Sequence, residues 1–228
     1  MKTYGTSMNI TNDIITSYIN QYYRPASAEL EELRRVGEAD YVPIILRETE
    51  MFLNTLLFTV SPSRILEIGT AIGYSALYFS ERCPEAEVYT IEKDEAMVQA
   101  ARHNIAAFGR EKQIHSLFGD GQEQVDRLRD QGISGFDFVF IDAAKSHYKR
   151  FMDAALSVCA PKALIVSDNI LQRGMTASDA YDPKQKHKTN IKKMREYVEY
   201  ITLDPTLSTS LLAVGDGLAV TIYRGEHG

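Results

Sequence analysis

The sequence lacks the features of a secreted or membrane protein. It has no tryptophan and only two cysteines, Cys83 and Cys159, in 228 residues. So few cysteines argue against a disulfide framework and suit a reducing compartment. No apolar run approaches the roughly 20 residues of a membrane-spanning helix, and the first residues, MKTYGTSMNITNDIITSYINQYY, are too polar for a secretory signal peptide. We expect a cytoplasmic protein with no membrane partner.

The sequence also lacks an obvious linker. No stretch rich in proline, glycine or serine divides it, and it has no internal repeat or low-complexity tract. Apolar residues make up 44% of the chain and charged residues 25%, which is typical of a globular domain. We predict a single domain over 1–228, with a helical cap at 1–60 and a core at 61–228.

Positive charge is scarce except in one segment. The net charge is −6, which argues against a surface that binds nucleic acid everywhere. Residues 183–195, PKQKHKTNIKKMR, nevertheless contain six Lys or Arg and no acid. A solvated loop that leads into a helix would explain this segment, and so would a contact with a polyanion.

The first 60 residues have the periodicity of helices. A helix at the start has one face of residues spaced four apart: Ile10, Ile14, Tyr18 and Tyr22. A second helix is expected at 27–40, with Ser27 as its cap. A third is expected at 42–60 and ends at Ser61 and Pro62.

Short apolar runs alternate with helical patterns in the remainder of the chain. The runs lie at 64–69, 87–92, 113–120, 136–142 and 163–169, and the helices between them at 73–83, 94–109, 122–130 and 146–159. This alternation indicates a parallel sheet covered on both faces. Residues 208–224 predict two strands around Gly215-Asp216-Gly217. We therefore predict an α/β fold: a doubly wound, Rossmann-like sheet of five parallel strands plus a C-terminal antiparallel hairpin, with helices on both faces and an N-terminal helical extension.

Polar side chains gather where the predicted strands end. They are Glu67, Glu92, Asp120, Asp142, Asp168 and Asn169. Ligands of doubly wound sheets bind at this edge. Each acid alone could cap a helix, but an edge with so many acids repels itself unless a cation lies among them.

The first three strand ends suggest a nucleoside cofactor. In EIGTAIGYS, Gly69 and Gly73 have the spacing G-x-x-x-G, which differs from the G-x-G-x-x-G of dinucleotide-binding proteins. Glu92 suits the two hydroxyls of a ribose, and Asp120 could accept a hydrogen bond from the amine of adenine. A nucleoside without a diphosphate indicates S-adenosylmethionine rather than NAD.

The last two parallel strands suggest a metal site. Asp142, Asp168 and Asn169 offer three oxygen ligands from adjacent strand ends. Oxygen ligands suit Mg²⁺, Ca²⁺ or Mn²⁺ rather than zinc. Lys145 follows Asp142 by one helical turn, so it would be aimed at the molecule that the cation binds.

These motifs resemble the class I, metal-dependent O-methyltransferases, the family of catechol and caffeoyl-CoA O-methyltransferases. The resemblance runs from about residue 40 to the end and rests on LEIGTAIGYSAL, YTIEKD, FGDG, FIDAAK, VSDNIL and VGDGLAV. It implies S-adenosylmethionine as the cofactor, held by Ile45, Glu67, Gly69, Thr70, Tyr74, Ser75, Glu92, Asp120, Gly121 and Asp142. It also implies Mg²⁺, or Mn²⁺ or Ca²⁺, bound by Asp142, Asp168 and Asn169, with Lys145 as the catalytic lysine.

Within this family, the motifs and YVPII are most similar to a bacterial branch that methylates 5-hydroxyuridine at the wobble position of tRNA. The chain has no tryptophan for an aromatic catechol gate, and Ala143 follows Asp142 where the catechol enzymes have a histidine. This resemblance implies tRNA as a partner. Residues 183–195 follow SDNILQRG after a short insertion, so we expect this basic segment to border the metal site and to contact the tRNA backbone. The wider family implies a homodimer, with the N-terminal helices as the expected interface.

Other functions stay open as alternatives. An O-methyltransferase of small catechols or phenols is the first. A non-enzymatic domain that senses S-adenosylmethionine or a nucleotide is the second, and the metal ligands with Lys145 count against it. An NAD oxidoreductase is disfavoured by the glycine spacing.

Overall fold

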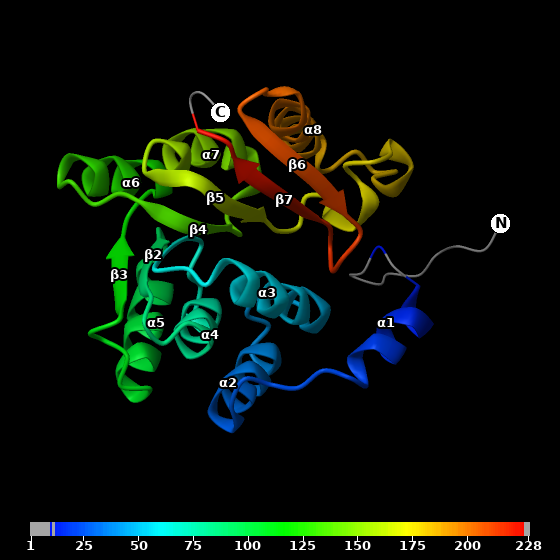
Figure 1. Cartoon of the computed structure of the whole chain (residues 1–228). Helices are drawn as coiled ribbons and strands as arrows, with labels where there is room; N and C mark the ends of the chain where they lie inside the picture. The colour runs from blue at the N-terminus through cyan, green and yellow to red at the C-terminus, as the bar shows by residue number, and fades with distance from the viewer. Residues whose placement is uncertain (1–9, 11, 226–228) are drawn as a thin grey trace.

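A seven-stranded mixed sheet forms the centre of the computed structural model, which describes residues 10 and 12–225 (Figure 1). The strand order is β3-β2-β1-β4-β5-β7-β6. The strands are β1 (Arg64–Ile68), β2 (Glu87–Glu92), β3 (Ile114–Phe118), β4 (Phe136–Ile141), β5 (Cys159–Ser167), β6 (Leu207–Leu212) and β7 (Leu218–Tyr223). Strands β1 to β5 pair in parallel, whereas β7 is antiparallel to both β5 and β6. The predicted sheet with its C-terminal antiparallel hairpin is confirmed.

Helices cover both faces of this sheet, as predicted (Figure 1). The helices are α1 (Asp13–Asn20), α2 (Ala28–Ala39), α3 (Arg47–Val60), α4 (Tyr74–Arg82), α5 (Glu95–Ala107), α6 (Gly121–Asp130), α7 (Tyr148–Leu156) and α8 (Lys188–Leu203). Short 3₁₀ turns lie at η1 (Lys145–His147), η2 (Gln172–Gly174) and η3 (Asp179–Tyr181).

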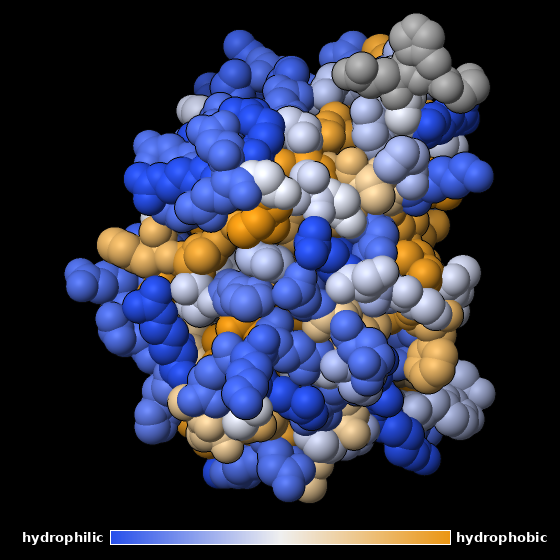
Figure 2. All heavy atoms as spheres, turned by 60° about the vertical axis from the view of Figure 1, so that its left-hand side comes forward, coloured by the Kyte–Doolittle hydropathy of each residue, from blue (hydrophilic) through white to orange (hydrophobic). Residues whose placement is uncertain are grey.

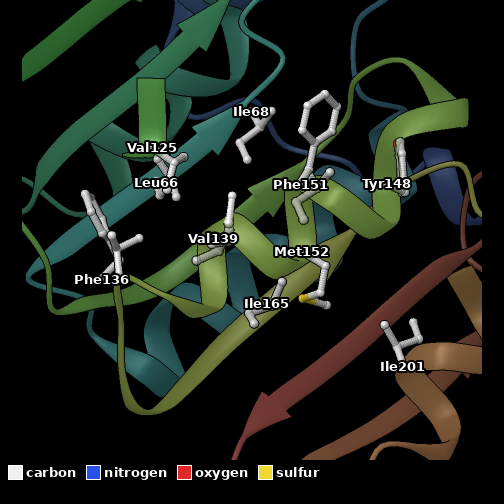
Figure 3. Close-up of a cluster of buried hydrophobic side chains, with 14 of the residues drawn as sticks. Leu66, Ile68, Val125, Phe136, Val139, Tyr148, Phe151, Met152, Ile165 and Ile201 are labelled. Atoms are coloured by element: carbon white, nitrogen blue, oxygen red, sulfur yellow. The ribbon is translucent and has the colours of Figure 1, made fainter. Parts of the chain in front are cut away.

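Two apolar cores form because side chains alternate across the strands. Leu66 and Ile68 of β1 face α6, α7 and α8, in the cluster that Figure 3 shows with Val125, Phe151 and Met152. Ile65, by contrast, packs in a second cluster with residues of α2, α3, α4 and α5. Because both faces are covered, the central strands are continuous apolar runs rather than alternating ones.

The third predicted helix is too long at its start. It spans Arg47–Val60, and residues 42–46 have no helical conformation. Pro43 disfavours a helical conformation at the residue before it and has no N–H to donate. The second helix follows the prediction closely, because the Ser27 hydroxyl accepts from Leu30 N at 3.1 Å as the expected cap.

The helix predicted at 146–159 is also wrong at its end. Helix α7 ends at Leu156, and Cys159 already belongs to β5, so that strand begins four residues before the predicted 163. The segment CAPKALIVS contains a proline, which suits the first part of a strand more than the last turn of a helix.

Helix α1 is shorter than the predicted apolar pattern, since it ends at Asn20 and excludes Tyr22. Ile14 and Tyr18 of its predicted face are 80% and 59% exposed, so this face is not buried against the rest of the described chain. Elsewhere, hydrophilic residues cover most of the face in Figure 2, with smaller hydrophobic patches between them. Within residues 12–225, no helix has the length and apolar character that crossing a bilayer requires.

Candidate active site

A cavity of about 870 Å³ opens at the carboxyl ends of the parallel strands. Strand β1 pairs with β2 on one side and β4 on the other, so the strand order reverses there, and this is where doubly wound sheets bind ligands. The cavity brings together almost all predicted site residues: Ile45, Gly69, Thr70, Tyr74, Ser75, Glu92, Asp120, Gly121, Asp142, Lys145, Asp168 and Asn169. Glu67 is the exception and lies beneath the cavity wall, with no exposed surface.

The turn after β1 requires glycine at its first position. Gly69 has a φ angle of 107°, and a Cβ atom there would lie 1.9 Å from the carbonyl oxygen of Asp142. Its own N–H donates to Ile91 O at 2.9 Å. The sequence therefore places the backbone of the loop directly against the end of β4, where any side chain would collide.

Glu67 is a buried acid on the face of β1 that packs against α4. The Thr90 hydroxyl donates to Glu67 Oε2 at 2.5 Å. Burial raises the pKa of Glu67 to about 7, hydrogen bonds from Ser75 and Thr90 oppose this rise, and the charge of Asp142 adds to it. A cationic ligand in the cavity above would favour the ionised form of this acid.

Glu92 ends β2 and is held by backbone donors on two sides. Its Oε2 accepts from Ala71 N at 2.9 Å, and its Oε1 accepts from Lys93 N and Asp94 N at 2.9 and 3.0 Å. These bonds fix an acid of β2 against the glycine turn of β1. The position suits a ribose diol, because each carboxylate oxygen can accept a further hydrogen bond.

Asp120 caps a helix, which is the alternative role that the sequence analysis allowed for each acid at a strand end. It caps α6 by accepting from Gln122 N at 3.0 Å, and both carboxylate oxygens pair with Arg150, at 3.0 and 2.5 Å. Burial raises the pKa of Asp120, but the hydrogen bonds and charge of Arg150 outweigh it and lower the pKa. Its contact with adenine stays a prediction, since the carboxylate lines the cavity and is already well satisfied.

Tyr74 and Ile45 connect the cavity to the N-terminal helices. The Tyr74 hydroxyl donates to Glu50 Oε2 at 2.8 Å, while buried Arg34 donates to both Tyr74 and Glu50. Arg34 also donates to Ile45 O at 2.9 Å. Ile45 therefore contributes an apolar wall from the non-helical segment 42–46, not from a helix as predicted.

The predicted metal ligands and Lys145 meet at the other end of the cavity. Asp142 Oδ1 accepts from Lys145 Nζ at 2.8 Å and from Asn169 Nδ2 at 2.9 Å. Asp168 Oδ1 accepts from the backbone N–H of Asn169 at 2.6 Å. Two carboxylates and one amide from β4 and β5 thus face one another, as the sequence predicted.

The charge of this centre fits a divalent cation. Burial, followed by the negative charge of Asp142, raises the pKa of Asp168 well above its usual range. Asp168 is buried and Asp142 is partly buried, and carboxylates that share a site are stabilised as anions when a cation binds between them. No group of three His, Cys, Asp or Glu side chains in the described part of the chain could hold a metal ion, so the amide oxygen of Asn169 would complete the set.

Lys145 lies in η1 and is held from two directions. Its ammonium donates to Asp142 and, at 3.0 Å, to the Tyr148 hydroxyl, which in turn donates to Asp168 O at 2.9 Å. Burial lowers the pKa of Lys145, but Tyr148 and Asp142 outweigh it and the net shift is upward. The lysine is therefore a positioned donor at the edge of the candidate metal centre.

Comparison with known proteins decides the family. The model of the O-methyltransferase family matches residues 20–224. The chain belongs to the O-methyltransferase family. The resemblance predicted from its motifs is confirmed at the level of this family.

Individual relatives are similar over different shares of their length. An O-methyltransferase of Aspergillus flavus is 30% identical over 64% of this chain and 60% of its own. A catechol O-methyltransferase of Niastella koreensis is 32% identical over 54% of this chain and 56% of its own. A solved Staphylococcus aureus structure, provisionally named a caffeoyl-CoA O-methyltransferase, is 31% identical with a TM-score of 0.86, over 92% of this chain and 100% of its own. The chain therefore spans about three fifths of the length of these two curated relatives.

Sequence reasoning missed two residues of this O-methyltransferase. Arg173 lines the cavity, and Asp216 accepts from Arg173 N at 2.5 Å. Burial raises the pKa of Asp216, and hydrogen bonding from Arg173 opposes this shift. The available signal is the acid between two glycines in VGDGLAV, which the sequence analysis uses as a turn and as a family motif but not as a site residue.

The basic segment lies beside the cavity but not in its wall. None of residues 183–195, all of which the structure describes, lines the cavity. The segment reaches the site indirectly, since Gln172 Nε2 donates to Asn190 O at 3.4 Å. The segment is a loop that leads into a helix, because α8 begins at Lys188, and its contact with a polyanion stays a prediction.

Proposed function

We propose that this O-methyltransferase is metal-dependent and transfers the methyl group of S-adenosylmethionine to a chelated hydroxyl. The proposed acceptor is 5-hydroxyuridine at the wobble position of tRNA, which would become 5-methoxyuridine. One observation carries the proposal: Asp142, Asp168 and Asn169 meet with Lys145 at one end of a cavity whose other end contains Glu92.

The oxygen ligands suit Mg²⁺ more than a transition metal. When bound, such a cation would lower the pKa of a chelated hydroxyl and fix its oxygen. A 5-hydroxyuracil ring offers two neighbouring oxygens, the hydroxyl and a ring carbonyl, which can chelate one cation much as a catechol does.

Lys145 would act on the acceptor oxygen. As an ammonium it can stabilise negative charge at that oxygen. Once it has lost its own proton, it can instead accept the proton of the hydroxyl. Asp142 and Tyr148 fix the direction of the donor before substrate binds.

The cofactor half would be built from Glu92 and the glycine turn. Glu92 would accept from the ribose, and Gly69 permits a close approach of the backbone. Ile44, Ile45 and Ile72 provide apolar walls that exclude water from the reacting groups. Methyl transfer from a sulfonium to an anionic oxygen removes charge, so a dry site favours it.

The exposed cations of 183–195 support tRNA as the substrate. Lys184, Lys186 and Lys188 are exposed and have no ion-pair partner within 4.0 Å in the described part of the chain. Buried Asp182 holds the backbone between them by accepting from Lys186 N and His187 N at 3.1 and 2.9 Å. Unpaired, exposed cations close together in the chain suit phosphodiesters.

A small catechol or phenol is the second candidate substrate. The names of the Niastella and Staphylococcus relatives favour it, since catechol and caffeoyl-CoA are the substrates that they state. These acceptors would use the same oxygen ligands and Lys145, and would leave Lys184, Lys186 and Lys188 without a role.

A direct comparison of acceptors tests the proposal. The purified enzyme is incubated with labelled S-adenosylmethionine and Mg²⁺, and with either tRNA that carries 5-hydroxyuridine or a panel of catechols. We expect label in the tRNA, at the wobble nucleoside after digestion. Label in a catechol and none in tRNA would contradict the tRNA assignment.

A further inference from the structure

The segment that follows the metal ligands has an unusual backbone. Asn169, Gln172 and Arg173 have φ angles of 58°, 47° and 57°, a region that residues other than glycine rarely adopt. Such conformations persist only where surrounding contacts hold them. The segment 169–174 is therefore fixed from outside.

The turn between β6 and β7 supplies these contacts. Ile170 N donates to Gly217 O and Leu171 N to Asp216 O, both at 3.0 Å. Asp216 Oδ1 then accepts from Arg173 N. A Cβ atom at Gly217 would lie 2.5 Å from Leu171, so glycine is needed for the turn to approach this closely.

These contacts place an unpaired cation, Arg173, at the end of the cavity where the candidate metal ligands lie. Arg173 lines the cavity and is exposed, and no carboxylate lies within 4.0 Å of its guanidinium in the described part of the chain. The neighbouring cations differ, because Arg150 pairs with Asp120 and Lys145 pairs with Asp142. Arg173 is thus available to a negatively charged group of a substrate.

We infer that Arg173 is a specificity-determining residue that binds a phosphate group attached to the target nucleoside, and that Asp216 positions it. This inference rests on the proposed function. A guanidinium can bind two phosphate oxygens at once, through charge-assisted hydrogen bonds. A neutral catechol or nucleoside gives Arg173 no such partner.

The position of Arg173 also agrees with a strand of nucleic acid. Gln172, the preceding residue, donates to Asn190 in the first turn of α8. Arg173 therefore follows the metal ligands in the chain and is next to a residue that contacts the segment 183–195. A strand whose target base enters the cavity would meet Arg173 first and the lysines next.

Three acceptors that present the same target nucleoside with different phosphate groups test the inference. They are 5-hydroxyuridine, its 5′-monophosphate and a trinucleotide with 5-hydroxyuridine in the middle. Arg173→Gln should lower kcat/KM for at least one phosphate-bearing acceptor, relative to the nucleoside, by about 10- to 100-fold. A loss for the monophosphate identifies a 5′-phosphate contact, and a loss confined to the trinucleotide identifies a phosphodiester.

Two controls separate binding from folding. Arg127→Gln removes the same charge from an exposed position on α6, outside the cavity, and should leave the acceptor preference unchanged. Asp216→Ala should raise KM for the same acceptor more than it lowers kcat, and Asp216→Asn, which keeps an acceptor oxygen, should restore much of the loss.

Equal effects of Arg173→Gln on all three acceptors would overturn the inference while the proposed function stands. Methylation of catechol with none of the three hydroxyuridines would instead overturn the proposed function, and the role of Arg173 with it.

Discussion

Lys145 is the residue on which the candidate chemistry depends most. Its ammonium lies within 3.0 Å of both the Asp142 carboxylate and the Tyr148 hydroxyl, at the cavity wall. The sequence predicted this position because one helical turn separates Lys145 from Asp142. It could not predict Tyr148 as the second anchor, since an aromatic residue in a helix pattern is usually part of the core.

Removing the Lys145 ammonium should slow methyl transfer itself. We expect Lys145→Ala to lower kcat by about 10²–10⁴, the range for a positioned acid–base or oxyanion-stabilising group. Binding of S-adenosylmethionine should survive, because Glu92 and the glycine turn remain. Single-turnover rates at saturating substrate measure the effect.

Lys149 provides the matched control for this experiment. It is exposed on α7 and pairs with Asp153 at 3.0 Å, away from the cavity. Lys149→Ala should leave the single-turnover rate within about twofold of the wild type. Similar rates for both variants would show that Lys145 is a surface lysine without a catalytic role.

Glu67 gives the stability of the protein a distinct pH dependence. Its pKa in the folded protein is about 7, above the ordinary value of 4.5. The protonated acid is therefore favoured on folding, and its contribution is fully present below about pH 4.5 and lost as the pH rises through about 7. We compare the free energy of unfolding of the unliganded Glu67→Gln variant with that of the wild type. The variant's advantage should be larger at about pH 8 than at about pH 5, by up to about 3 kcal/mol.

Urea unfolding of the wild type and the variant at both pH values measures this difference. A free-energy difference that does not change with pH would mean that Glu67 ionises normally in the folded protein.

At the scale of elements, the order and type of most strands and helices could be predicted because the local patterns agree with the fold. The apolar runs RILEIG and FDFVFID are buried on both faces, and each ends where the polar edge begins. The start of α3 could not be predicted from periodicity, because Ile44 and Ile45 fit a helical stripe yet line the cavity in a non-helical segment.

Contacts between residues far apart in the chain were the second feature that the sequence could not predict. Arg173 and Asp216 are 43 residues apart, and their contact depends on how the β6–β7 turn packs against the end of β5. No local pattern around either residue indicates it. The acids at the strand ends were predictable, whereas the cations that pair with them, such as Arg150 on α7, were not.

The turn between β1 and α4 should tolerate no side chain at Gly69. Gly69→Ala would place a Cβ atom on the Asp142 carbonyl oxygen, so we expect lower stability by several kcal/mol and loss of activity. Gly109 is the matched control. Its φ angle of 64° is also left-handed, but a Cβ atom at this position would have no neighbouring atom within 4 Å.

Gly109→Ala should cost only about 1 kcal/mol, the conformational penalty alone. Thermal unfolding measures both variants. Equal losses in the two would show that backbone conformation, and not the contact with Asp142, explains the glycine at position 69.

At the scale of the whole molecule, positive charge gathers in the segment 183–195, whereas the chain as a whole is negative. The chain has a net charge of −6, yet Lys184, Lys186 and Lys188 stand together without carboxylate partners in the described chain. The composition predicted this asymmetry. It could not show that Lys192 and Lys193 of the same segment pair with Glu196, at 3.9 and 2.8 Å.

This division predicts which lysines bind tRNA. Replacing Lys184, Lys186 and Lys188 with Gln should flatten the slope of log K against log salt, by somewhat less than one for each phosphate that a lysine no longer neutralises. Replacing Lys192 and Lys193 should change the slope less, because Glu196 already neutralises them in part. Filter binding over a range of salt concentrations compares the two variants, and equal slopes for both and for the wild type would leave this segment a solvated loop.

The central claim is that Asp142, Asp168 and Asn169 hold a divalent cation that methyl transfer requires. The most direct measurement is the initial rate with the best acceptor, first with excess chelator and then with Mg²⁺ restored, beside calorimetric binding of S-adenosylmethionine. We expect chelator to abolish the rate and Mg²⁺ to restore it in the wild type but not in the Asp168→Ala, Asn169→Ala double variant, which should still bind S-adenosylmethionine. A full rate in excess chelator, or full activity of that variant, would contradict the account.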